Sequence, residues 1–212
     1  MISQLAASVA HEVYSPLTGI KGFLQLSHKN LKNSKPLEAE YILIAYNETL
    51  KAENIIKEYL SLANTVINLD EQIEVIKEVD QIKDEINFYA FQNDVHIEYS
   101  IDQKLFIIGN REKFRLIIKK ILANAIEASF PKSIVCCHAY KHDEKVRIKI
   151  SDYGKGMSKE ALETAGLPSY KLQEKGTGLS LMICYRIVHL MNGTIQINSV
   201  EGLGTTVIIE FQ

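Results

Sequence analysis

The sequence predicts an α+β protein in which an antiparallel helical hairpin precedes an α/β sandwich. Apolar side chains recur at helical spacing up to about residue 64, whereas later residues mix alternating, strand-like runs with further helical ones. The strands and helices of this second part lack a regular βαβ alternation, which argues for an α+β sandwich. We therefore expect two domains, residues 1–66 and residues 72–212, joined by a hinge at about 65–71.

The composition excludes several classes of protein. A chain of 212 residues fits one or two domains, and 46% hydrophobic residues are enough to form a core. A net charge of −2 gives no electrostatic reason to bind nucleic acid, and no polybasic run points to a membrane surface. No apolar run reaches the roughly 18 residues that cross a bilayer, and the N-terminus lacks a signal-peptide pattern. We expect a cytoplasmic protein with no membrane segment in this chain.

The first helix of the hairpin is expected from residue 3 to about residue 30. Its apolar residues recur at steps of three or four, namely Leu5, Val9, Val13, Leu17, Ile20 and Leu24. A turn at 32–36 then precedes a second helix that runs to about residue 64, and Pro36 suits the first turn of that helix.

The second helix has a seam close to a heptad repeat, with small residues in its middle. The seam consists of Ile42, Ala45, Thr49, Ala52, Ile56, Tyr59 and Ala63. Two helices joined by a short turn cannot bury a whole apolar stripe alone, whereas two copies of the hairpin form a four-helix bundle. The sequence therefore predicts a homodimer through the hairpin.

One histidine of the first helix differs from its surroundings. His11 lies off the apolar stripe, is followed by Glu12, and precedes Pro16. Pro16 has no N–H to donate to the carbonyl of Glu12, so the helix should kink or loosen just beyond the histidine. An imidazole beside a carboxylate at such a joint suggests that His11 is itself the substrate of the reaction. The simpler interpretation, a solvated surface residue, applies to the other histidines.

The second domain is expected to contain three helices and six strands. The helices are 78–90, 111–129 and 177–191, and the strands are 95–101, 105–108, 134–140, 145–151, 194–199 and 205–211.

Three polar motifs of this domain fit together as a nucleotide site. Asn124 stands late on a helix, and its amide oxygen suits Mg²⁺, which takes few protein ligands beside phosphate oxygens. Asp152 follows a strand and can accept a hydrogen bond from an exocyclic amine, while Gly154 and Gly156 allow close backbone approach. Residues 176–180 (GTGLS) open a helix whose free N–H groups favour phosphate. Each motif alone is commonly a turn or a cap, but their order and spacing together indicate a Mg·ATP site.

These motifs, with the run from His11 to Leu26 (HEVYSPLTGIKGFLQL), resemble the catalytic core of the sensor histidine kinases. The run looks most like the sporulation-type kinases of spore-forming Firmicutes. The resemblance covers nearly all 212 residues. It implies a dimerisation and histidine-phosphotransfer hairpin followed by an ATPase domain with the Bergerat fold of the GHKL proteins.

Carried over to this chain, the resemblance implies a role for each motif. His11 would accept the phosphoryl group, and Glu12 would act as its base. Asn124 would hold Mg²⁺, Asp152 would bind the amine of adenine, and Thr205 would lie near the adenine. The pocket and its lid would be shaped by Gly154, Gly156, Gly176, Thr177, Gly178 and Leu179.

The implied activity is ATP-dependent autophosphorylation of His11, followed by transfer to an aspartate of a response-regulator receiver domain. The cofactors would be ATP and Mg²⁺. Because phosphoryl transfer depends on in-line positioning, the ATPase domain would have to swing onto the hairpin. The input would come from a sensor module that is either a separate protein or lost by truncation, since only ten residues precede His11.

The chain departs from the usual family pattern at several positions. Tyr14-Ser15 replaces Arg-Asn, Lys120 replaces an Asn, Ser169 replaces a lid Phe, Lys171-Leu172-Gln173 replaces Thr-Thr-Lys, and Ser180 replaces a Gly. The lid changes predict weak ATP affinity without loss of the fold, and Ser15 bears on phosphatase activity toward the partner. An alternative function therefore stays open, a degenerate phosphotransferase or adaptor that keeps the phosphoacceptor histidine but binds ATP weakly or not at all.

Overall fold

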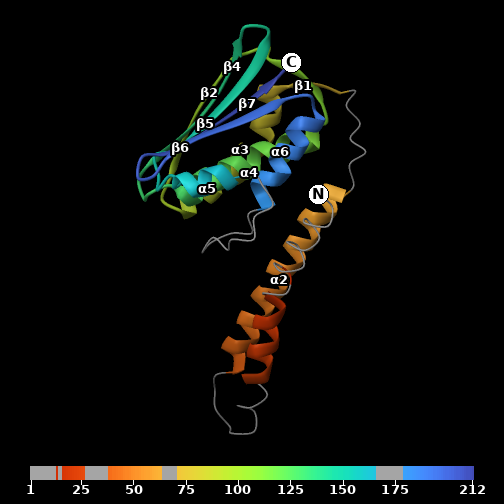
Figure 1. Cartoon of the computed structure of the whole chain (residues 1–212), viewed down its shortest axis with the longest axis vertical. Helices are drawn as coiled ribbons and strands as arrows, with labels where there is room; N and C mark the ends of the chain where they lie inside the picture. Colours follow the sequence, from red (N-terminus) through yellow and green to blue (C-terminus); the bar gives the residue numbers. More distant parts are fainter. Residues whose placement is uncertain (1–12, 14–15, 27–37, 64–70, 166–178) are drawn as a thin grey trace. The chain divides into compact units, whose positions relative to one another are not determined.

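The computed structural model describes residues 13, 16–26, 38–63, 71–165 and 179–212. These residues divide into two compact units, one formed by the described residues up to 63 and the other by those from 71 onward (Figure 1). None of the helices in the described ranges has both the length and the apolar character needed to cross a bilayer.

The first unit is a pair of antiparallel helices, as the sequence predicts. Residues 16–26 are helical, and helix α2 runs from Glu38 to Ala63. Phe23 stacks on Tyr41 with 6.2 Å between the ring centroids, and the Cα of Gly19 faces the side chain of Glu48. Because later residues on α2 meet earlier residues on the first helix, the two helices run in opposite directions.

Within the predicted seam of α2, the two alanines are buried, whereas Thr49 between them and the isoleucines at 42 and 56 are exposed. Ala45 and Ala52 are 4% and 5% exposed, whereas Ile42 and Ile56 remain 54% and 44% exposed. Other large apolar side chains of this unit are also exposed, namely Leu17, Leu24, Leu26, Leu43, Tyr46 and Leu50. One hairpin therefore leaves much of its apolar surface uncovered.

The second unit is built on a five-stranded sheet. Its strand order is β2-β4-β5-β7-β6, in which β2 runs parallel to β4 and all other neighbours are antiparallel. The strands are β2 (His96–Ile101), β4 (Ile134–His142), β5 (Lys145–Ser151), β6 (Thr194–Val200) and β7 (Gly204–Phe211). Five of the six predicted strands thus form this sheet.

Three helices cover one face of the sheet (Figure 1). They are α3 (Val75–Gln92), α4 (Arg111–Ala128) and α6 (Leu179–Leu190), and α4 packs against both of the others. The core between helices and sheet includes Phe114, Ile117, Ile121, Leu122, Ile148, Ile150, Ile183, Ile209 and Phe211, all at most 2% exposed. The mixed, non-alternating order of these elements confirms the predicted α+β class.

Two elements were not expected from the sequence. Strand β1 (Glu71–Glu74) pairs antiparallel with β3 (Phe106–Gly109) in a separate two-stranded sheet, so residue 71 belongs to a strand and not to a hinge. Helix α5 (Lys159–Thr164) is short and is capped by Ser158, whose hydroxyl accepts a hydrogen bond from the backbone N–H of Ala161 at 3.2 Å.

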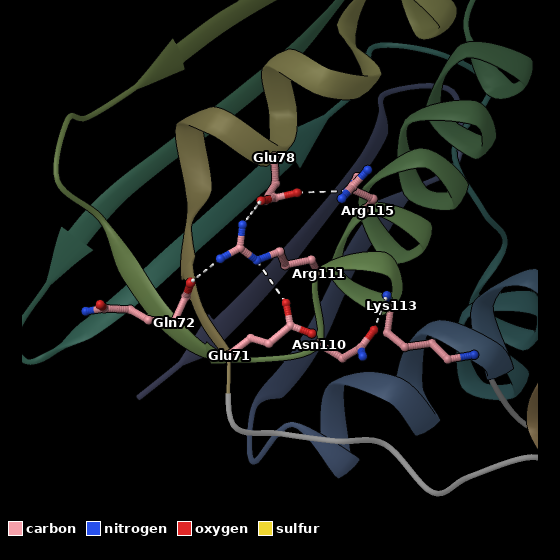
Figure 2. Close-up of polar contacts among 7 residues, drawn as sticks. All are labelled: Glu71, Gln72, Glu78, Asn110, Arg111, Lys113 and Arg115. Atoms are coloured by element: carbon pink, nitrogen blue, oxygen red, sulfur yellow. Dashed lines mark hydrogen bonds and ion pairs between the residues drawn. The ribbon is translucent and has the colours of Figure 1, made fainter.

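An ion-pair cluster joins α3 to the beginning of α4 (Figure 2). The Glu78 side chain is only 6% exposed, and its carboxylate lies 2.8 Å from Arg115 Nε and 3.7 Å from Arg111 Nη1. A buried carboxylate is costly unless it is paired, and here two guanidinium groups supply the pairing.

Arg111 also reaches strand β1. Its Nε lies 2.9 Å from the Glu71 carboxylate, and its Nη2 donates to the carbonyl of Gln72 at 3.3 Å. Asn110 caps α4 beside it, because the Asn110 side chain accepts a hydrogen bond from Lys113 N–H at 3.0 Å. The strand that opens the second unit is therefore fastened to the first turn of α4 (Figure 2).

Candidate functional site

Asp152 is the buried carboxylate at the end of the central sheet. It follows β5 and shares the helix-covered side of that strand with Ile148 and Ile150, because side chains alternate along a strand. The residue is 5% exposed. Its Oδ1 accepts hydrogen bonds from the backbone N–H of Gly154 at 3.0 Å and of Thr205 at 3.2 Å. Two backbone donors thus hold the carboxylate in one orientation.

Burial sets the protonation behaviour of Asp152. Loss of hydration raises the pKa of its carboxyl group above the ordinary value of 3.8, while the N–H groups of Gly154 and Thr205 and the charge of Lys155 oppose the rise. A carboxylate that is costly to bury favours a ligand that brings further hydrogen-bond donors to it.

Two glycines allow the loop after Asp152 to pack against other backbone. A Cβ on Gly154 would lie 1.9 Å from the carbonyl oxygen of Ala128, and one on Gly156 would lie 2.0 Å from that of Val200. Gly156 also has a φ of +61°, a backbone conformation that residues with a side chain rarely adopt. The expected close backbone approach is therefore made within the protein, and it fixes the position of the loop that carries Asp152.

Hydrogen bonds complete this packing at both sides of the loop. Lys155 N–H donates to the Ala128 carbonyl at 2.9 Å, at the C-terminal end of α4. The Lys155 carbonyl accepts from Gly202 N–H at 2.8 Å, in the turn between β6 and β7. The loop thereby connects α4 with that turn.

Asn124 lies on α4 one turn before Ala128 and is half-buried. Since Ala128 bonds to the loop at Lys155, the fold brings the Asn124 end of α4 to the loop that holds Asp152. Lys120, one turn earlier, is also half-buried, whereas Lys119 forms an ion pair with Glu85 on α3.

Thr205 is bonded to Asp152 through its backbone in both directions. Besides donating to Oδ1, it accepts a hydrogen bond at its carbonyl from Asp152 N–H at 2.9 Å. Its Oγ1 lies 2.9 Å from the Oγ of Ser199, its register partner on β6. This brings Thr205 directly to the Asp152 carboxylate.

Two residues of this site were missed by the sequence analysis. Gly204 has φ +106°, and a Cβ there would lie 2.2 Å from the carbonyl oxygen of Asp152. The Gly-Leu-Gly-Thr sequence at the start of β7 was a usable signal for it. Ser199 gave no such signal, because its importance depends on the β6–β7 register that places it opposite Thr205.

Comparison with known proteins gives the family. Residues 1–65 match the His Kinase A (phospho-acceptor) domain. Residues 109–212 match the histidine kinase-, DNA gyrase B-, and HSP90-like ATPase. The chain belongs to the histidine kinase family. Within that family it is a catalytic core similar to sporulation kinases, which confirms the resemblance stated above.

The relatives of this histidine kinase core are longer than the chain itself. It is 32% identical to Sporulation kinase B of Bacillus subtilis (strain 168) over 99% of this chain and 49% of that protein. Identity to Sporulation kinase D of the same organism is 33%, over 99% of this chain and 41% of that protein. The chain thus spans about half the length, or less, of these relatives.

A solved structure shares the fold of this histidine kinase core. The crystal structure of histidine kinase ThkA in complex with response regulator protein TrrA superposes with a TM-score of 0.78 at 22% identity. The match covers 97% of this chain and 60% of that one.

Some predicted site residues of this kinase core lie outside the described residues. They are His11, Glu12, Gly176, Thr177 and Gly178, together with the departures at Tyr14, Ser15, Ser169 and 171–173. Leu179 is the first residue of α6, and Ser180 follows it, half-buried. The described part of the site therefore consists of Asn124, Asp152, Gly154, Gly156 and Thr205, with Ser199 and Gly204 added.

Proposed function

We propose that the chain is the catalytic core of an ATP-dependent protein-histidine kinase that phosphorylates its own His11. The observation that carries the proposal is the buried Asp152 carboxylate, held by two backbone N–H groups at the loop that packs on the end of α4. Membership in the histidine kinase family supports it. The domains would be 1–66 for dimerisation and phosphotransfer and 72–212 for ATP binding.

The described residues fit a nucleotide with Mg²⁺. Asp152 Oδ1 is engaged by backbone, so Oδ2 would accept from the exocyclic amine of adenine. No three His, Cys, Asp or Glu side chains gather as a metal site in the described part of the chain, and Asn124 with phosphate oxygens is the donor set that suits Mg²⁺. A bound Mg²⁺ would offset the charge of the transferring phosphoryl group. The N–H groups of residues 176–179 would bind the phosphates.

The proposed reaction needs a neutral imidazole. One ring nitrogen of His11 would attack the γ-phosphorus of ATP while the bond to the bridging oxygen breaks, giving phosphohistidine and ADP. Glu12 would hold or accept the proton of the other ring nitrogen, which raises the nucleophilicity of the attacking one. The segment ahead of β1, residues 65–70, would let the ATPase domain reach the histidine.

The proposed partners follow from the same reaction. Exposed apolar side chains of the hairpin, such as Ile42 and Ile56, support a homodimer in which two hairpins form a four-helix bundle. An aspartate of a response-regulator receiver domain would take the phosphoryl group from His11, and the ThkA structure was solved with a response regulator. A sensor module would supply the input, and the reaction would take place in the cytoplasm.

Transfer of label from γ-³²P-ATP tests the proposal. The wild type should gain acid-labile label, and His11→Gln should gain none. His142→Gln is the matched control, because His142 is an exposed histidine at the β4–β5 turn and should leave labelling unchanged. If the wild type stays unlabelled yet accepts a phosphoryl group on His11 from a phosphorylated receiver domain, the kinase proposal is wrong and the degenerate phosphotransferase is correct.

A further inference from the structure

The Ser199 hydroxyl makes three hydrogen bonds, and it has only one proton to give. Its Oγ lies 3.0 Å from the carbonyl oxygen of Gly204, 2.8 Å from the backbone nitrogen of Met157, and 2.9 Å from Thr205 Oγ1. A carbonyl oxygen can only accept, and a backbone N–H can only donate. The Ser199 proton is therefore directed at Gly204, and Ser199 accepts from Met157.

The remaining contact then has a defined direction. Because the Ser199 proton is used at Gly204, the Thr205 hydroxyl must be the donor in the Ser199–Thr205 hydrogen bond. With its proton turned toward Ser199, Thr205 Oγ1 offers only lone pairs to any other group. Thr205 is half-buried and shares the helix-covered side of the sheet with Asp152.

The Asp152 carboxylate beside Thr205 is also a hydrogen-bond acceptor. Its Oδ1 already accepts from the Gly154 and Thr205 backbone N–H groups, and the carboxylate form has acceptor capacity alone. This edge of the proposed nucleotide site therefore presents two acceptors and no side-chain donor from this pair.

We propose that Ser199 is a positioning residue that fixes the Thr205 hydroxyl as an acceptor, so that the Asp152–Thr205 edge selects a purine with a 6-amino group. This inference rests on the proposed function, in which ATP binds here. A purine with a carbonyl at position 6 would place its oxygen against two acceptors, and a buried acceptor without a donor is costly. Ser199 on β6 also accepts a hydrogen bond from Met157 N–H, which holds the loop after Gly156 against this strand. The contact thereby helps to keep Asp152 and Thr205 in fixed positions relative to each other.

The test compares the affinities of the full chain for ATP and ITP, whose bases carry an amino group and a carbonyl group, respectively, at position 6; N1 carries a proton only in ITP. Competition against a fluorescent ATP analogue would be measured for the wild type, Ser199→Ala and Ser199→Thr. In Ser199→Ala the Thr205 hydroxyl is released and can turn its proton to a carbonyl, so the ratio of ATP to ITP affinity should fall about tenfold. Ser199→Thr keeps the hydroxyl and should restore the ratio.

The sheet supplies a matched control for these variants. Ser151 Oγ lies 3.0 Å from Thr206 Oγ1, a hydroxyl pair between neighbouring strands like that of Ser199 and Thr205 but on the opposite side of the sheet. Ser151→Ala should leave the affinity ratio unchanged. Thr205→Val should lower the ratio by itself, and adding Ser199→Ala to it should have little further effect, because Ser199 acts through Thr205.

The outcomes separate this inference from the proposed function. A wild type that binds no ATP overturns the proposed function. A wild type that binds ATP, with an unchanged ratio in a Ser199→Ala variant that unfolds at the wild-type temperature, overturns the role of Ser199 alone. An equal loss of ATP and ITP affinity in Ser199→Ala also overturns it, because that result describes a residue that only supports the loop.

Discussion

At the scale of single residues, Asp152 combines deep burial with a charge. The backbone N–H groups that hold its Oδ1 offset part of the lost hydration, but the pKa of the carboxyl group remains raised. A group whose pKa is higher in the folded protein than in the unfolded chain binds more protons in the folded state. Its contribution to the free energy of unfolding is therefore most favourable at low pH and declines as the pH rises from about 3.8 through the raised pKa.

Asp152→Asn should separate stability from nucleotide binding. The amide oxygen can take the two backbone hydrogen bonds, while the NH₂ group replaces the second acceptor and would face the amine of adenine. We expect a melting temperature above that of the wild type at pH 7, a difference that shrinks toward pH 4, and loss of ATP binding. Thermal unfolding of the wild type and the variant between pH 4 and pH 7 measures the difference in melting temperature. A variant that is less stable than the wild type at every pH would show that the carboxylate stabilises the site.

At the scale of elements, the cluster around Glu78 holds α3, α4 and β1 together. Cations in the first turn of a helix oppose the helix dipole, at a cost of about 0.3–1 kcal/mol each. Arg111 occupies this unfavourable position on α4, and its ion pairs with Glu71 and Glu78 offset that cost. The place of Arg111 in the first turn of α4 is therefore explained by the ion pairs that its side chain forms and not by the residue preferences of a helix N-terminus.

Removing the Arg115 cation should lower the free energy of unfolding more than neutralising the Glu78 carboxylate does. Arg115→Met leaves the buried Glu78 carboxylate with Arg111 alone, whose Nη1 lies 3.7 Å away, so the loss should be smaller than the roughly 3–5 kcal/mol typical of a buried pair that is broken outright. Glu78→Gln should cost less, and adding it to Arg115→Met should recover part of the stability. Urea unfolding measures all three variants. Lys77→Met is the control, since the Lys77 side chain that pairs with Glu74 is exposed, and its loss should change stability by less than about 0.5 kcal/mol. Equal losses for Arg115→Met and the double variant would contradict the argument.

The long helices and the long strands of this protein could be predicted from the sequence because each shows several periods of its pattern, whereas the six-residue helix α5 is too short to do so. Strand β1 could not, because its four residues contain a single apolar side chain, Ile73, which is too short a run to show alternation. Its existence depends on pairing with β3, more than thirty residues later. Asp152 and Asn124 were predicted from residue type and spacing, whereas Ser199 depends on the strand register.

At the scale of the whole molecule, the two units differ in how completely they bury their apolar residues. The second unit has a closed core of large side chains, including Phe114 and Phe211 at 0% and 1% exposure. The helical unit buries alanines and leaves isoleucines such as Ile42 and Ile56 exposed on α2. A helical hairpin with this surface is expected to gain most of its stability by association.

The double variant Ile42→Glu/Ile56→Glu should therefore lower the oligomeric state. Charges in the apolar interface of a bundle are costly, so the variant should elute as a monomer in size-exclusion chromatography with light scattering at concentrations where the wild type is a dimer. Phe91→Glu is the matched control, because Phe91 is 80% exposed on α3 of the other unit and should leave the dimer intact. A double variant that remains dimeric would place the dimer interface elsewhere.

The fastening of β1 has a mechanical consequence. A pull along β1 would load its ladder of hydrogen bonds to β3 in parallel, whereas a pull across it would break them one after another. Arg111 would carry part of either load from Glu71 and Gln72 into the first turn of α4, the helix that bears Asn124. A force applied to the chain at residue 71 would thus be transmitted to α4, the helix of the proposed metal site. The direction of the force would determine how much of it β1 resists.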